Sequence, residues 1–209
     1  MIRNKLSRWV REKYLAPQMR MRASQFAHLR PEPGKVVFLG DSITEGGLWH
    51  EWFPEHPVLN RGIGGNTVDE VAERLDTALT DPSAVFLLIG TNDLGMGAGV
   101  QETASRCRDL VADLRTRAPH APLFVQSVMP RQHKFADQIR QLNTHYQRIA
   151  DDADATYIDL WPALDDGSGQ LRGEFTLDLL HLNGAGYAAW VRELQPHLAL
   201  LVARRDAAS

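Results

Sequence analysis

One segment sets the architecture of this chain: Val36-Val37-Phe38-Leu39-Gly40-Asp41-Ser42-Ile43-Thr44. Its first four residues form an apolar run, as expected of a strand buried on both faces. Gly40 permits a tight or unusual backbone turn, and a serine at position 42 is favoured where a helix begins. The segment therefore predicts a strand, a turn and a helix start, with Ser42 at the carboxyl end of the strand.

The rest of the chain repeats this alternation. Strand-like segments lie at 58–60, 84–89, 123–128 and 156–160, and segments of helical length lie at 68–80, 100–117, 136–152 and 184–204. Such alternation predicts a parallel sheet with helices on both faces and right-handed crossovers. Ligands of these sheets bind beyond the carboxyl ends of the strands.

Length and composition fit one sizeable globular domain, since 209 residues are 44% hydrophobic and 23% charged. No apolar run approaches the roughly 20 residues of a membrane-spanning helix. The start of the chain lacks the apolar core of a secretory signal. The single Cys107 cannot form an internal disulfide, and we expect it to be a buried helix residue. Together these features favour a cytoplasmic protein.

The net charge of −3 hides an asymmetry. Residues 1–30 hold eight basic side chains against Glu12, a net charge of +7 that leaves −10 for the remainder. We expect a helix over residues 5–29, broken at Pro17, so that residues 1–33 form a basic helical extension of a domain spanning 34–209. Its apolar residues would pack on the acidic body or on a second subunit; weak contact with an anionic membrane surface is the alternative. The apolar residues of this extension are Leu6, Trp9, Val10 and Leu15. We expect no nucleic-acid partner.

A possible nucleophile, base and acid occur far apart in the chain. A serine hydroxyl is a weak nucleophile that needs a neighbouring base. His181 has a carboxylate, Asp178, three residues earlier in a loop-like setting before the last helical segment, and this carboxylate could hold the imidazole ring. We therefore expect Ser42, His181 and Asp178 to act together; Asp159 is the reserve acid, although local hydrogen bonding is its more ordinary role. The alternative for Ser42 is a simple helix cap.

Two further polar segments follow strands directly: Gly62-Ile63-Gly64-Gly65-Asn66 and Gly90-Thr91-Asn92-Asp93. Attack on a carbonyl creates an oxyanion that needs preplaced hydrogen-bond donors. The backbone N–H groups of Ser42 and Gly65 and the side-chain amide of Asn92 are suitable donors, although spacing alone does not single out one glycine of its loop. These segments are predicted to meet Ser42 at one edge of the sheet.

These four blocks, in this order, resemble those of the SGNH (GDSL-type) hydrolase family. The resemblance spans about residues 36–200, with Ile43 where the name-giving pattern has leucine. It implies a three-layer α/β/α, flavodoxin-like fold with a five-stranded parallel sheet in the order 2-1-3-4-5, and metal-independent ester hydrolysis. By position it makes Ser42 the nucleophile, Gly65 and Asn92 oxyanion donors, His181 the base and Asp178 its partner. It does not cover the N-terminal 30 residues.

The resemblance implies a carboxylic ester hydrolase that works through an acyl-enzyme on a small-molecule ester. No long apolar groove is visible, which favours short, acetyl-type acyl groups. The alternatives are a carbohydrate O-acetylesterase, a lysophospholipase or thioesterase, and a non-catalytic binding protein on the same fold. Six residues are candidates to line an acyl pocket, although packing in the core is an equal alternative for Leu48 and the two tryptophans. They are Leu48, Trp49, Trp52, Met129, Leu179 and Leu180.

Other patterns do not fit metal or nucleotide chemistry. His50 and His56 stand six residues apart with Pro54 between them, unlike the histidines of a zinc helix. The glycine-rich residues 94–99 lack the Lys-Ser/Thr ending of a nucleotide loop, and we expect them to form a mobile flap over the active edge. No metal or cofactor is expected.

Overall fold

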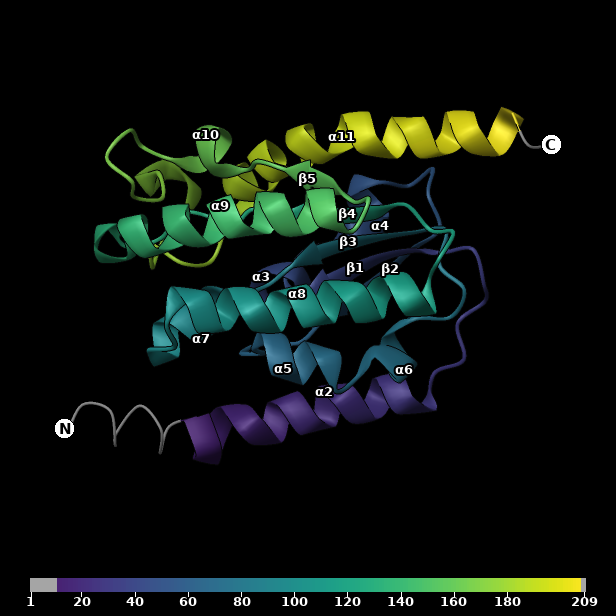
Figure 1. The fold of residues 1–209 in the computed structure, drawn as a ribbon, viewed down its shortest axis with the longest axis horizontal. Coiled ribbons are helices and arrows are strands. Elements are labelled where there is room, and N and C mark those ends of the chain that lie inside the picture. Colours follow the sequence, from purple (N-terminus) through teal and green to yellow (C-terminus); the bar gives the residue numbers. More distant parts are fainter. Residues whose placement is uncertain (1–10, 208–209) are drawn as a thin grey trace.

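The computed structural model describes residues 11–207, in which a five-stranded parallel sheet lies between two layers of helices (Figure 1). The strands are β1 (Val36–Gly40), β2 (Val58–Gly62), β3 (Ala84–Leu88), β4 (Leu123–Gln126) and β5 (Thr156–Ile158). Their order is β2-β1-β3-β4-β5, and every neighbouring pair is parallel. The predicted α/β class, the five strands and the order implied by the resemblance are confirmed.

Helices and helical turns connect the strands. They are η1 (Arg11–Leu15), α2 (Ala16–His28), α3 (Ser42–Glu45), α4 (Trp49–Trp52), α5 (Val68–Ala72), α6 (Leu75–Ala78), α7 (Thr91–Met96), α8 (Val100–Arg117), η2 (His133–Phe135), α9 (Ala136–Asp152), α10 (Trp161–Leu164), η3 (Gly173–Phe175) and α11 (Gly184–Ala207). The bounds of α8 and α9 agree with the predicted segments, because their apolar residues recur at helical spacing.

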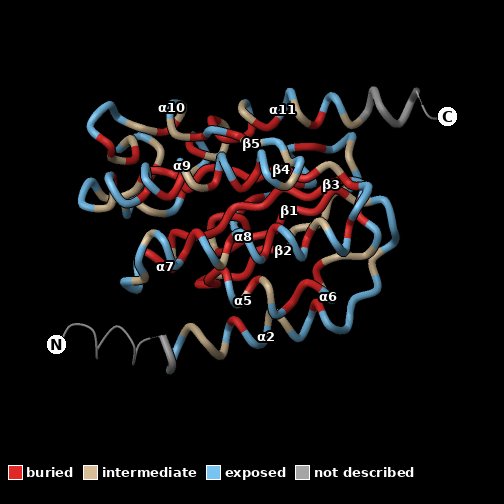
Figure 2. Tube along the Cα trace, viewed as in Figure 1, coloured by how far each residue is buried: buried red, intermediate tan, exposed pale blue. Residues whose placement is uncertain are grey.

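Strands β1, β3 and β4 are buried along their whole length (Figure 2). Alternate residues of the strands contribute to two cores, one on each face of the sheet. Val37 and Leu39 of β1 pack with α5, α6, α8 and α9, and this core also holds Cys107, which is fully buried as predicted. Val36 and Phe38 face the opposite core, formed with α3, α4, α10 and α11. Burial on both faces explains why these strands read as continuous apolar runs.

Two predicted segments differ from the structure. Residues 68–80 form two helices because the chain turns at Arg74, whose side chain folds inward and donates to the carbonyl of Gly40. Residues 94–99 are not one continuous loop: residues 94–96 belong to α7, and Gly97–Gly99 link it to α8, so movement of this link as a flap stays a prediction. The reason is packing, since Leu94 is buried and a Cβ on Gly95 would lie 3.1 Å from the Arg131 guanidinium.

The N-terminal helix α2 lies beside α6 (Figure 1). Met19 and Phe26 of α2 pack on Ile63, which follows β2. Pro17 stands in the first turn of α2, where a missing N–H is tolerated, and the helix type changes from the π-helical turn η1 to α2 between Leu15 and Ala16, close to the predicted break. The start of the predicted helix, with Leu6, Trp9 and Val10, lies outside the described residues. Self-association, membrane contact and the domain boundary after residue 33 stay predictions.

None of the helices within residues 11–207 is both long enough and apolar enough to cross a membrane.

Candidate active site

Ser42 begins helix α3 directly beyond the carboxyl end of β1. Sequence reasoning left open that Ser42 is the helix cap, but the cap is Asp41, whose Oδ1 accepts the backbone N–H of Ile43 at 3.0 Å. The Ser42 hydroxyl lies instead 2.9 Å from His181 Nε2. Asp41 thus caps the helix and leaves the serine side chain available for contact with the histidine.

His181 and Asp178 lie in the loop before α11, and their side chains meet as the sequence predicts. His181 Nδ1 lies 2.7 Å from Asp178 Oδ2, and the other carboxylate oxygen accepts the backbone N–H groups of Leu180 and His181 at 2.9 and 2.8 Å. If Nδ1 carries the ring proton and donates it to Asp178, Nε2 is left as an acceptor for the Ser42 hydroxyl.

The electrostatic state of Asp178 follows from these contacts. Burial by itself would raise its pKa, but hydrogen bonds from the His181 ring and from two backbone N–H groups outweigh it and lower the pKa to about 2. Asp178 is therefore a carboxylate across the neutral pH range. This carboxylate beside Nδ1 holds the imidazole ring in its orientation toward Ser42.

The loop that carries Asp178 is held in an unusual conformation. The Thr176 hydroxyl accepts the backbone N–H groups of Asp178 and Leu179, at 3.2 and 3.0 Å. Leu179 has a φ of +59°, in the left-handed region that costs a leucine strain energy. Gln132 adds a hydrogen bond from its amide to the carbonyl of Asp178 at 3.2 Å. Sequence reasoning missed Thr176 and Gln132, because neither belongs to a recognisable motif.

Helix α11 connects the histidine side of the site to the serine side. It begins three residues after His181, and its Tyr187 hydroxyl donates to the carbonyl of Ile43, next to Ser42, at 2.7 Å. Gly46 lies so close that a Cβ there would approach the same hydroxyl to 2.5 Å. These contacts fix the separation between α3 and the start of α11 without any link along the chain.

The loop 62–66 follows β2 and lies against Ser42. A Cβ placed on Gly64 would stand 3.6 Å from Ser42 Cβ, and Gly65 has a φ of +82°, which a residue with a side chain adopts only at a cost. Asn92 donates from Nδ2 to the backbone carbonyl of Asn66 at 2.9 Å. An amide nitrogen carries two hydrogens, so a second one remains for another acceptor. The structure thus brings Asn92 to the loop that holds Gly65.

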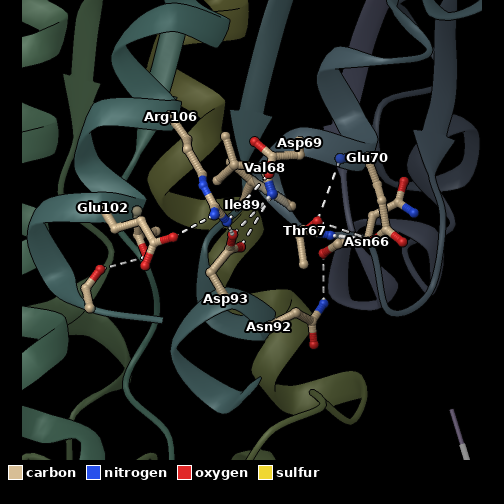
Figure 3. A network of polar contacts seen from close by, with 12 residues as sticks. Asn66, Thr67, Val68, Asp69, Glu70, Ile89, Asn92, Asp93, Glu102 and Arg106 are labelled. Carbon is tan, nitrogen blue, oxygen red and sulfur yellow. Dashed lines mark hydrogen bonds and ion pairs between the residues drawn. The ribbon is translucent and has the colours of Figure 1, made fainter. Parts of the chain in front are cut away.

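A polar network anchors Asn92 (Figure 3). The adjacent Asp93 is buried and accepts the backbone N–H of Val68 at 3.2 Å, which ties α7 to the start of α5. Arg106 of α8 approaches this carboxylate at 3.9 Å and Asp69 at 3.3 Å. Burial raises the pKa of Asp93 to about 6, and the Val68 hydrogen bond and Arg106 oppose that rise. These contacts hold the first turn of α7, and with it Asn92, against α5 and α8.

Not all the predicted pocket-lining residues lie on the surface of the site. Trp49 and Met129 are only 1% and 3% exposed and belong to the core, where Trp49 stacks on Phe38 with ring centroids 4.2 Å apart. Trp52 lines a different hollow, formed with residues 53–56 and the later part of α11. Leu48 is exposed, and Leu180 packs against the core beneath the site. Leu177, which precedes Asp178 in the chain, was not among the predicted lining residues, and its side chain is 98% exposed.

The reserve acid Asp159 is not part of this arrangement. Its carboxylate accepts the backbone N–H of Trp161 at 3.0 Å, two residues further along the chain. Local hydrogen bonding, the more ordinary role anticipated for it, is what the structure shows.

Asp41 gives the site a pH-dependent stability. Burial raises its pKa from 3.8 to about 7, although the Ile43 N–H opposes that rise, and its Oδ2 is buried without a hydrogen-bond partner. Between these two pKa values the folded protein holds a proton that the unfolded chain has released. The contribution of Asp41 to the free energy of unfolding therefore falls as the pH rises from 3.8 to about 7, and it does not change further above that pH.

We expect the free energy of unfolding of the wild type to fall by about 2 kcal/mol more than that of Asp41→Asn between about pH 5 and about pH 8. An asparagine keeps the acceptor for the Ile43 N–H but does not titrate. Urea unfolding of both proteins at the two pH values measures the difference. Parallel pH profiles would show that Asp41 is ionised in the fold.

Comparisons with known proteins identify the family and agree with the fold. The profile of the GDSL-like Lipase/Acylhydrolase family matches residues 38–189, and the chain belongs to this family. It is 29% identical over 181 residues to Homo sapiens platelet-activating factor acetylhydrolase IB subunit alpha1, covering 81% of this chain and 78% of that one. These comparisons confirm the family that the four sequence blocks indicate.

Solved structures show the same architecture. A structure described as a candidate platelet activating factor from Streptococcus pneumonia has a TM-score of 0.84 and 26% identity, covering 93% of this chain and 99% of that one. An acetylxylan esterase, Axe2 from Geobacillus stearothermophilus, is similar in fold, with a TM-score of 0.65 and 20% identity, covering 80% and 95% of the two chains.

Proposed function

We propose that this acylhydrolase is a serine carboxylic ester hydrolase that works through an acyl-enzyme on short, acetyl-type esters. One observation carries the proposal: two contacts of 2.9 and 2.7 Å join Ser42, His181 and Asp178, although Ser42 and His181 lie 139 residues apart in the chain. A hydroxyl with a base, and a base with a carboxylate behind it, is the arrangement that activates serine.

The proposed reaction has two halves. Ser42 Oγ attacks the ester carbonyl while His181 Nε2 takes the hydroxyl proton, and the carbonyl π electrons move onto oxygen. The tetrahedral intermediate collapses, the bond to the alcohol oxygen breaks, and His181 returns the proton to that alcohol. Water then attacks the acyl-serine with the same proton transfers, which releases the acid and restores Ser42.

The tetrahedral intermediate carries a negative oxygen. The proposed donors are the backbone N–H groups of Ser42 and Gly65 and the side-chain amide of Asn92. In support, Ser42 begins a helix, the 62–66 loop lies against Ser42, and Asn92 is tied to that loop. Loss of one such donor slows turnover by about 10²–10³-fold in serine hydrolases.

A short acyl group is favoured on two grounds. Trp49 and Met129, which could have deepened an acyl pocket, are buried in the core instead. The name of the human relative specifies hydrolysis of an acetyl group. Neither ground concerns the alcohol part of the ester, so acetylated substrates with different alcohols are needed to identify it.

A chain-length series tests this substrate class. We expect kcat/KM to be highest for p-nitrophenyl acetate and to fall about tenfold or more by the octanoate. The reason is that a site shaped for a short acyl group cannot accommodate the extra methylenes without displacing the reacting carbonyl. Rising values towards long chains would contradict the short-acyl proposal and favour a lysophospholipase or thioesterase. Acetylated sugars, assayed alongside with acetate release as the readout, would identify a carbohydrate O-acetylesterase.

A further inference from the structure

The loop that holds Gly65 is a tight turn rich in glycine. Gly64 and Gly65 stand next to each other, and glycine restricts neither of the backbone torsions that decide where an N–H points. An oxyanion donor is useful only when its direction is fixed before the reaction. A turn hydrogen bond from the Asn66 N–H to the Ile63 carbonyl at 3.1 Å closes the loop around both glycines, and contacts from outside place this turn relative to Ser42.

Glu45 provides such a contact. It is the last residue of α3, one helical turn after Ser42, so the two side chains leave neighbouring positions of one helix. Its Oε2 accepts the backbone N–H of Gly64 at 2.7 Å. A hydrogen bond to a carboxylate is shorter and stronger than one to a neutral acceptor. The residue that follows this anchored N–H along the chain is Gly65.

The position of Glu45 is fixed in turn by two other elements. The Asn60 amide of β2 donates to the carbonyls of Thr44, Glu45 and Gly47, at 3.1, 2.9 and 3.0 Å, and so clamps the end of α3. Arg22 of α2 forms an ion pair with Oε1 of Glu45 at 3.4 Å. One carboxylate oxygen thus faces the loop and the other faces the N-terminal helix.

Packing of helix α2 against the residue that follows β2 keeps Arg22 next to Glu45. Phe26, one turn further along α2, is 3% exposed and packs on Ile63, the residue before Gly64. The Arg22 and Arg61 guanidinium groups lie 5.0 and 4.6 Å from the Phe26 ring centroid, within cation–π range. The segment outside the family motifs therefore contacts the 62–66 loop through apolar groups at Ile63, and its Arg22 contacts Glu45, which binds the same loop.

We propose that Glu45 is a positioning residue that fixes the oxyanion loop through Gly64, and that Arg22 makes helix α2 part of the catalytic unit by holding Glu45. This inference rests on the proposed ester hydrolysis. Its consequence is that the basic N-terminal helix acts on turnover, whether or not it also meets a membrane or a second subunit.

The test compares kcat and KM of four full-length variants on p-nitrophenyl acetate. We expect Glu45→Ala to lower kcat about 10–100-fold with KM changed less than about threefold, since a misdirected donor costs somewhat less than a missing one. Glu45→Gln keeps an acceptor for Gly64 and should retain kcat within about threefold. Arg22→Met should lower kcat by about three- to tenfold. Arg20→Met, an exposed position on the same helix, should leave it unchanged.

Several outcomes would overturn the inference. These are a Glu45→Ala kcat within about twofold of the wild type, a Glu45→Gln loss as large as that of the alanine variant, or a change confined to KM. If Glu45→Ala does not fold, Arg22→Met decides, and an unchanged kcat overturns the inference. If the wild type hydrolyses no ester, both the proposed function and this inference are wrong. If the wild type is active and the variants keep its kcat, only this inference is wrong.

Discussion

Ser42→Ala is expected to lower kcat for p-nitrophenyl acetate by at least about 10⁴-fold, because removal of the attacking oxygen leaves only the oxyanion donors and substrate binding. The Ser42 hydroxyl contacts His181, and the helix cap is supplied by Asp41. The substitution therefore removes no structural hydrogen bond of α3. Initial rates at saturating substrate, with purified variant and wild type side by side, measure the effect.

The control for this experiment is an equally small change elsewhere. Ser83→Ala alters an exposed serine before β3 and should retain full turnover. The circular dichroism spectrum and melting temperature of Ser42→Ala should match those of the wild type. Turnover within about tenfold of the wild type would show that another residue attacks the ester.

Asp178→Asn is expected to lower kcat by about 10³–10⁴-fold. The reason lies in the two oxygens of this carboxylate. Oδ1 accepts two backbone N–H groups, so an asparagine oxygen will stay there and place its NH₂ against His181 Nδ1. An NH₂ donor forces the ring proton to Nε2, where the base can no longer accept the Ser42 proton.

The matched control is Asp159→Asn, which changes the reserve carboxylate in the same way. Because Asp159 only accepts the N–H of Trp161, we expect kcat within about twofold of the wild type. Steady-state kinetics of both variants give the comparison. A larger loss in Asp159→Asn than in Asp178→Asn would reverse the assignment of the acid.

The sheet could be predicted from sequence because its strands are buried on both faces. Continuous apolar runs such as Ala84–Leu88 identify strands, and polar residues shortly after them mark the sheet edge at which Ser42 and Asn92 lie. The pairing of His181 with Asp178 was also predictable, since it is local in the chain and lies in a loop before the last helix.

The supporting contacts were beyond prediction because they join side chains to distant backbone groups. Arg74 divides one predicted helix by turning inward to Gly40, and no periodic pattern encodes that bond. Glycines at 95, 97 and 99 suggested one continuous loop, but residues 91–96 are helical and Arg131 lies against Gly95. Trp49 illustrates the same limit, since an aromatic residue near a motif can serve the core or the site equally well.

Glu45 shows where a signal was present in the sequence but unused. It lies three residues after Ser42, a spacing that places both on neighbouring positions of a helix. What no local pattern reveals is its partner, the backbone of Gly64 nineteen residues further along. Contacts of this kind depend on the register between β1 and β2, which only the folded sheet defines.

Covalent labelling with a fluorophosphonate tests most directly whether the hydroxyl beside His181 is an activated nucleophile. Intact-mass spectrometry and peptide mapping of the wild type should show one adduct, on Ser42, and the rate of labelling should fall by about 10³-fold or more in Asp178→Asn. No adduct on the wild type, or an adduct on a residue other than Ser42, would contradict the proposed chemistry.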